Sequence, residues 1–142
     1  MPQELKRKNP FQAKLNSYRN TEVMTANRET ILLMLYAGAA RFLRQAIEAN
    51  TRKDYSEKSR LIGRTQEIIS ELRATLNFKV GEEIATALES LYDFITDRLI
   101  TGNKDNSTPA LSEALNIITT LQSAWEQAID SLKTNKNSNN QP

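Results

Sequence analysis

Apolar residues recur at helical intervals through most of the chain, and they mark out four long segments. The first stripe consists of Ile31, Leu35, Ala39, Phe42 and Ala46. Side chains spaced by three or four residues lie on one face of an α-helix. The same spacing returns in residues 61–76, 84–99 and 111–132. The pattern therefore predicts four amphipathic helices, each about 20–28 residues in length.

Start and stop signals bound these segments. Asn27 can cap the first helix, and Asp54-Tyr55-Ser56-Glu57 has the residues of a capping box at the start of the second. Gly81 separates the second helix from the third, and Gly102-Asn103 is a typical helix end. Thr108-Pro109 has the form of a cap followed by proline at the first helical position. Because the connections are short, sequential helices are expected to be antiparallel. We predict an all-α protein, an antiparallel up-down four-helix bundle over residues 27–133.

The two ends of the chain differ from the predicted bundle. Residues 1–26 contain two prolines and few apolar side chains, and are expected to form a flexible, basic N-terminal arm. Phe11, Leu15 and Tyr18 within it have the spacing of a short helix, which would need to dock in order to be stable. The Asn-rich residues 134–142 are expected to be a disordered tail.

Composition excludes most catalytic chemistry. The sequence contains no histidine and no cysteine. Their absence removes the commonest general base, the usual zinc ligands, disulfides and thiol nucleophiles. The carboxylate pairs Glu67/Glu71 and Asp93/Asp97 lie at helical spacing and are interpreted as solvated faces. We therefore expect no enzyme activity, no metal ion and no cofactor.

The formal net charge of +2 is unevenly placed. Residues 1–20 carry five basic residues against Glu4, a net charge of +4, so the remainder is mildly acidic. Neither a Gly-rich phosphate loop nor interleaved aromatic residues accompany the basic cluster, so nucleic acid is not an expected partner. The longest apolar run, Ile31 to Ala40, is half of what a bilayer requires. We expect a cytoplasmic protein without membrane insertion.

That apolar run nevertheless indicates an interaction surface. A helix that is apolar on every side must be covered on every side. If Leu35 faces the bundle core, then Leu33, Tyr36 and Ala40 point elsewhere. The N-terminal segment, a partner or packing within the bundle can cover them, and the pattern favours none of these. Periodicity and composition alone thus indicate an all-α interaction module whose partner is unnamed.

Several short motifs follow one another along the chain. They are Asn9–Phe11 (N-P-F), Val23–Asn27 (V-M-T-A-N), Leu33–Ala39 (L-M-L-Y-A-G-A), Gln66–Leu72 (Q-E-I-I-S-E-L), Gly81–Ala85 (G-E-E-I-A), Leu91–Phe94 (L-Y-D-F), Arg98-Leu99 and Ala124-Trp125. In this order they resemble the motifs of the FliS-type flagellin export chaperones, over about residues 9–130. Three departures are clear. Asn27-Arg28 replaces the family's usual Ser-Pro helix start. Ala37 stands where the family usually has aspartate, and Lys14 stands where the arm usually has a second tyrosine.

The resemblance implies a helical bundle in the bacterial cytoplasm that binds the disordered C-terminal segment of flagellin. Such a chaperone prevents premature polymerisation and assists delivery to the flagellar type III secretion apparatus. The client lies partly as helices in apolar grooves of the bundle. Export-gate components, a co-chaperone or an anti-sigma factor are further candidate partners, and the protein is expected to be a monomer or weak dimer. The alternative is a self-associating structural bundle or adaptor without a flagellin client.

The expected exposed face and the family's binding mode together give candidate site residues. For flagellin binding they are Leu33, Tyr36, Ala40, Leu43, Tyr92 and Ile95. Phe11 and Leu15 are the candidates for an arm that flagellin displaces. If Tyr36 lies on the surface, Tyr36→Asp should abolish binding and leave helicity intact. If Tyr36 lies in the core, the same change should unfold the protein.

Overall fold

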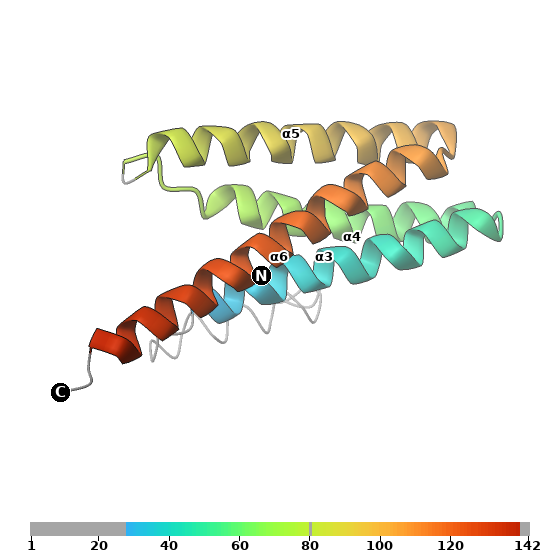
Figure 1. Ribbon diagram of the computed structural model, residues 1–142. Coiled ribbons are helices and arrows are strands. Elements are labelled where there is room, and N and C mark those ends of the chain that lie inside the picture. Colours follow the sequence, from blue (N-terminus) through green and yellow to red (C-terminus); the bar gives the residue numbers. More distant parts are fainter. Residues whose placement is uncertain (1–27, 80, 140–142) are drawn as a thin grey trace, which may run out of the picture. The chain divides into compact units, whose positions relative to one another are not determined.

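The computed structural model describes residues 28–79 and 81–139 (Figure 1). These residues form four α-helices: α3 (Arg28–Thr51), α4 (Tyr55–Ala74), α5 (Glu82–Asp105) and α6 (Thr108–Asn139). No strand occurs in the described ranges. The predicted all-α, antiparallel four-helix bundle is confirmed. Residues 33–142 form one compact unit, and the packing described below lies within its described part. The predicted arm, residues 1–26, lies outside the described residues.

The turn between α3 and α4 follows the sequence prediction. Lys53 adopts a left-handed backbone conformation with φ of 63°, which reverses the chain. The side chain of Asp54 then accepts a hydrogen bond from the backbone N–H of Glu57 at 3.3 Å. This bond satisfies one of the free N–H groups at the helix start. The predicted start of α4 at Asp54 is therefore confirmed.

The end of α5 differs from the prediction. The helix does not stop at Gly102-Asn103 but continues to Asp105, and Asn106 caps it with a left-handed φ of 52°. Asparagine tolerates this conformation better than most residues, so it can replace glycine as a C-terminal cap. Gly102 instead lies inside the helix and is buried against Leu111 of α6. The missing side chain serves close packing rather than chain reversal.

Two boundaries of α6 also differ. The side chain of Ser107 accepts a hydrogen bond from the backbone N–H of Ala110 at 3.2 Å, so Ser107 caps the helix rather than Thr108. At its other end α6 continues past the expected boundary at residue 133 to Asn139. The helix therefore includes most of the segment expected to be a tail. Residues 140–142 lie outside the described residues.

All four helices contribute to an apolar core. Its largest fully buried aliphatic side chains are Leu35, Leu43, Ile62, Ile69, Leu72, Ile95, Leu99, Leu111 and Ile118. These residues lie on the predicted helical stripes, apart from Leu43, and they follow the spacing of one buried face per helix. The periodicity of the sequence thus identified most of the core correctly.

A polar cluster closes one end of the bundle, at the α5–α6 turn. The buried Lys58 of α4 donates from Nζ to the carbonyl oxygen of Asn103 at 2.8 Å and to Oδ1 of Asn106. Asn50 of α3 donates from Nδ2 to the carbonyl oxygen of Asn106 at 3.0 Å and to Oγ1 of Thr108 at 2.9 Å. Burial lowers the pKa of Lys58. The cluster therefore fixes the turn against both α3 and α4.

From this closed end, α6 begins beside α5 and crosses towards α3 along its length (Figure 1). Arg98 of α5 pairs with Glu113 of α6 at 3.8 Å near the turn. Further along, the indole N–H of Trp125 in α6 donates to the hydroxyl of Tyr36 in α3 at 3.2 Å. Near the turn α6 therefore contacts α5, and further along it contacts α3. The side of α6 that faces α5 is less covered with increasing distance from the turn.

Candidate interaction surface

The structure buries most of the side chains that the sequence assigned to an exposed binding face. Tyr36, Ala40, Leu43, Tyr92 and Ile95 are each at most 1% exposed. The expectation that Tyr36, Ala40 and Leu43 lie on an exposed face of α3 is therefore wrong. Tyr92 and Ile95 also belong to the predicted apolar stripe of residues 84–99, and they are buried with it. Flagellin binding by these five residues stays a prediction. Other helices of the bundle cover α3 on more than one side, as a helix that is apolar all round requires.

Three other predicted site residues have different outcomes. Leu33 is partly exposed, so it stays a candidate at the edge of α3. Ala37, the position that departs from the family pattern, is exposed. Phe11 and Leu15 lie outside the described residues, and their role in a displaceable arm stays a prediction.

Two of the buried residues belong to a hydrogen-bonded aromatic cluster. The hydroxyls of Tyr36 and Tyr92 lie 2.6 Å apart, and either can donate to the other. The oxygen of Tyr36 also accepts from Trp125, since an indole N–H can only donate. The cluster joins α3, α5 and α6 in the interior of the bundle. Polar groups taken out of water are satisfied there, and the bonds hold three helices in one arrangement.

Burial favours the neutral form of both tyrosines. It raises the pKa of Tyr36, which the hydrogen bonds from its two neighbours only partly oppose. It raises the pKa of Tyr92 further, and the hydrogen bond to Tyr36 acts in the same direction. Neither hydroxyl is therefore a base or nucleophile near neutral pH.

An apolar surface opens beyond this cluster. Along α5 the side chains at Leu99, Ile95 and Tyr92 are buried, whereas Leu91 and Leu88 are partly exposed and Ile84 is 66% exposed. The same gradient runs along α6 in the opposite direction. Its side chains are buried at Ala114 and Ile118, partly exposed at Leu121 and Trp125, and exposed at Ala128 and Leu132, although Ile129 between the last two is buried.

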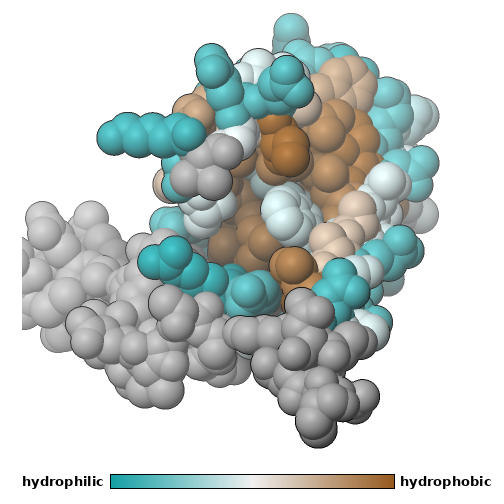
Figure 2. Space-filling view, turned by 60° about the vertical axis from the view of Figure 1, so that its left-hand side comes forward, coloured by the Kyte–Doolittle hydropathy of each residue, from teal (hydrophilic) through white to brown (hydrophobic). Residues whose placement is uncertain are grey.

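We define the open apolar face by the uncovered ends of these two stripes. It consists of Ile84, Leu88, Leu91, Trp125, Ala128 and Leu132. Since α5 and α6 are antiparallel, the beginning of α5 and the later half of α6 lie at the same end of the bundle (Figure 1). Figure 2 shows a hollow in which apolar side chains gather, with hydrophilic side chains around it. Apolar surface exposed in this way is typical of an interaction site.

Helical periodicity did not reveal this face, for a physical reason. All but Ala128 of its residues lie on the helical stripes that it assigned to the core. Periodicity specifies which side of a helix is apolar, but it does not specify how far along the helix a neighbour covers that side. The crossing of α6 from α5 towards α3 decides this. In the structure α6 has 32 residues and α3 and α5 have 24 each, so α6 is longer than the helices it packs against.

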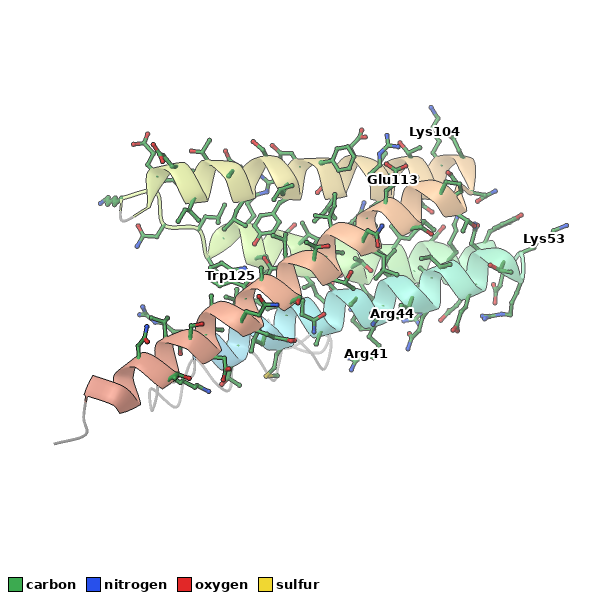
Figure 3. The ribbon with its side chains drawn as sticks, in the orientation of Figure 1. Arg41, Arg44, Lys53, Lys104, Glu113 and Trp125 are labelled. Atoms are coloured by element: carbon green, nitrogen blue, oxygen red, sulfur yellow. The ribbon has the colours of Figure 1, made fainter. Side chains whose placement is uncertain are left out.

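Outside this face the described surface is mostly polar, with separate exposed apolar side chains at Tyr55, Phe78, Phe94 and Ile100. Arg41 and Arg44 project from α3 away from α5 (Figure 3), and both are exposed. In the described parts of the chain, no group of three or more acidic side chains is placed to hold a metal ion. None of the helices described is both long and apolar enough to cross a membrane. The open apolar face is the feature that suggests a partner.

The fold and this face define a class: an all-α module that offers an apolar surface to another protein. Comparison with known proteins gives the family. The profile of the family described as "Flagellar protein FliS" matches residues 11–132. The chain belongs to this family, as its motifs indicated.

Individual relatives agree over most of the chain. The flagellar secretion chaperone FliS of Bacillus subtilis (strain 168) is 35% identical over 123 residues, which cover 87% of this chain and 88% of that protein. The flagellar secretion chaperone FliS of Vibrio cholerae is 32% identical over 76% of this chain and 79% of its own length. The protein of the same name from Salmonella typhimurium is also 32% identical, over 74% of this chain and 78% of its own length. Family membership supports a role as a flagellar export chaperone and implies a protein that is not an enzyme.

Proposed function

We propose that this protein is a cytoplasmic export chaperone that binds the C-terminal segment of flagellin. Membership of a family of flagellar secretion chaperones supports the export role. The observation that carries the binding role is the open apolar face, with Ile84 and Leu132 exposed by 66% and 63%. Large aliphatic side chains gathered at one end of a bundle gain free energy when a partner covers them.

The proposed binding mode is a client helix lying along the open apolar face. An amphipathic helix can insert one row of apolar side chains between α5 and α6, where these helices separate. Leu33 at the edge of α3 is the one candidate from the sequence that stays partly exposed. Ordering a disordered segment costs a few kcal/mol, roughly 2–5, so the client must bury a long apolar surface to bind usefully.

The proposed mechanism is steric masking. While the client segment lies on the bundle, it is not free to pair with other flagellin molecules. Release then requires only a competing site at the type III export apparatus, and no chemical step. In this proposal Phe11 and Leu15 of the N-terminal arm occupy part of the same surface until flagellin replaces them.

Calorimetric titration with the C-terminal segment of the cognate flagellin tests the proposal. We expect one-to-one binding with a negative change in heat capacity, because apolar surface is buried. The double variant Ile84→Gln/Leu132→Gln should bind at least about tenfold more weakly, since each site loses apolar burial of about 1–2 kcal/mol. Both side chains are exposed, so the helix content should not change.

Ile100 supplies a matched control on the same helix. It is 54% exposed and lies outside the open apolar face, so Ile100→Gln should bind as tightly as the wild-type protein. Equal affinity in the double variant and the control would place the site elsewhere. Absence of binding by the wild-type protein, together with concentration-dependent dimers that flagellin does not disturb, would favour a self-associating bundle instead.

Removal of residues 1–20 tests the arm separately. If the arm competes for the face, the shortened protein should bind the flagellin segment more tightly than the full chain. Equal affinity of both forms would remove competition by the arm and leave the binding site itself unaffected.

A further inference from the structure

We infer that Trp125 is a contact residue for the client within the open apolar face, and that Tyr36 positions its indole ring. This inference rests on the proposed function. It identifies Trp125 as a specific contact residue within the face. It also gives a role to Tyr36, which the sequence predicted to be on the surface and which the structure buries.

Trp125 lies where the burial of α6 changes. Towards the α5–α6 turn, Ile118 is fully buried. Towards the end of the helix, Ile129 is still buried but Leu132 is exposed. The indole of Trp125 is partly exposed, so a part of the ring is available to a partner. Figure 3 shows Trp125 in the half of α6 that lies further from the turn.

The polar edge of the indole is fixed from inside the bundle. Its N–H donates to the hydroxyl oxygen of Tyr36 at 3.2 Å, across 89 residues of sequence. That hydroxyl is itself held by Tyr92 at 2.6 Å. Both tyrosines are at most 1% exposed, so their rings cannot turn without disturbing the core. The N–H bond therefore sets the orientation in which Trp125 presents its apolar surface.

Such an arrangement suits a binding anchor. Tryptophan is enriched among the few residues that carry most of the energy of an interface. A side chain held in its bound orientation loses less conformational freedom on association, and this preorganisation increases affinity. The buried tyrosine pair makes no contact with solvent, so its contribution to binding acts through Trp125.

Three single variants test the assignment, each titrated with a tryptophan-free C-terminal segment of flagellin at a temperature where circular dichroism confirms full folding. Trp125→Ala should weaken binding by at least about thirtyfold, as expected for an interface hot spot. Tyr36→Phe keeps the ring but removes the acceptor of the indole N–H, and it should weaken binding by roughly three- to tenfold. Thr96→Val is the matched control.

The control removes a part-buried hydrogen bond within α5. Thr96 donates from Oγ1 to the carbonyl oxygen of Tyr92 at 2.9 Å, and this bond does not involve the indole N–H. Thr96→Val should therefore leave affinity unchanged even if it lowers stability. Since the chain contains one tryptophan, emission reports on Trp125 alone. Emission should shift on client binding, and in Tyr36→Phe it should already differ in the unbound protein.

Three outcomes overturn all or part of the inference, and they are distinguishable. If the wild-type protein does not bind the flagellin segment, the proposed function and this inference fail together. If the wild-type protein binds but Tyr36→Phe shows unchanged affinity and unchanged emission, only the positioning role fails. Unchanged affinity in Trp125→Ala would remove the contact role of Trp125 while leaving the open apolar face as the proposed site.

Discussion

Two buried tyrosines make this protein sensitive to alkaline conditions. Burial raises the pKa of Tyr36 and Tyr92 above the ordinary value of 10.0. In the unfolded chain these hydroxyls release their protons near pH 10, while in the folded bundle they retain them. The folded state therefore binds more protons than the unfolded state above pH 10. Stability from this pair is complete below pH 10 and is lost as the pH rises through the raised values.

We predict that the free energy of unfolding falls above pH 10 by up to about 1.4 kcal/mol per pH unit for each buried tyrosine. Urea denaturation at pH 8, 10 and 11 measures this slope. The double variant Tyr36→Phe/Tyr92→Phe should lack most of it. The lowered pKa of Lys58 has the opposite effect on the free energy of unfolding as the pH approaches 10.5. This contribution is the same in the wild-type protein and the double variant. Equal slopes in the two proteins would mean that the tyrosines ionise alike in the folded and unfolded states.

Lys58 is a buried cation that donates hydrogen bonds to two neutral oxygen atoms at the C-terminal end of α5. The end of a helix carries partial negative charge, so a cation is favourable there. Lys58→Met would keep most of the side-chain volume but leave two oxygen acceptors without their donor. Removal of such a partner costs about 1–3 kcal/mol, and relief of the desolvation of Lys58 offsets a part of it.

We therefore predict that Lys58→Met lowers the free energy of unfolding by about 1–2 kcal/mol. Lys104→Met is the control, because Lys104 is exposed near the same helix end and should change stability by less than about 0.5 kcal/mol. Chemical denaturation of both variants gives the comparison. A Lys58→Met protein as stable as the wild type would mean that desolvation of the ammonium group cancels its hydrogen bonds.

At the scale of single helices, two glycines occupy similar positions and should respond in opposite ways. Gly63 lies inside α4, and a Cβ atom added there meets nothing within 4 Å. Gly102 lies inside α5, and its Cβ would approach Cγ of Leu111 to 2.6 Å. Leu111 is fully buried, so it has no free space into which to move. Alanine has a higher helix propensity than glycine at both sites, but only Gly63 has space for the added methyl group.

We predict that Gly63→Ala raises the free energy of unfolding by about 0.5–1 kcal/mol, from helix propensity and a less flexible unfolded chain. Gly102→Ala should lower it by up to about 2 kcal/mol, because overpacking outweighs the same gain. Thermal and urea unfolding of the two variants side by side provide the measurement. A stabilised Gly102→Ala protein would show that α5 and α6 can separate slightly at their turn without cost.

The helix boundaries illustrate which local signals were reliable. Asp54 acts as the predicted cap of α4 because its hydrogen bond depends only on residues within one turn. The predicted end of α5 at Gly102 was wrong because glycine has two uses, chain reversal and close packing. Only the position of Leu111 on the neighbouring helix decides between them. Sequence signals therefore predicted a helix boundary correctly where the interaction involves only residues within one helical turn.

At the scale of the whole molecule, packing rather than surface charge holds the bundle together. The ion pairs within the described part of the chain, such as Arg73 with Asp93 and Arg98 with Glu113, have partly exposed side chains. Exposed pairs contribute little and are screened by salt. We predict that raising sodium chloride from 0.1 to 1 M changes the free energy of unfolding by less than about 1 kcal/mol. Urea denaturation at both salt concentrations tests this, and a larger loss would indicate a cooperative charge network.

The sequence by itself determined the four helices of the described residues, their approximate limits, most of the core and the family to which the chain belongs. These follow from helical periodicity, from capping residues and from motif order, all of which are properties of contiguous residues. The open apolar face depended on tertiary structure. Ile84 and Leu132 have the same spacing as core residues, and they are exposed only because α6 crosses from α5 towards α3 before the stripes end. Conversely, Tyr36 is buried because α5 and α6 both supply it with hydrogen-bonding partners. Which apolar residues are covered is a property of helices far apart in the chain, and periodicity along one helix does not contain it.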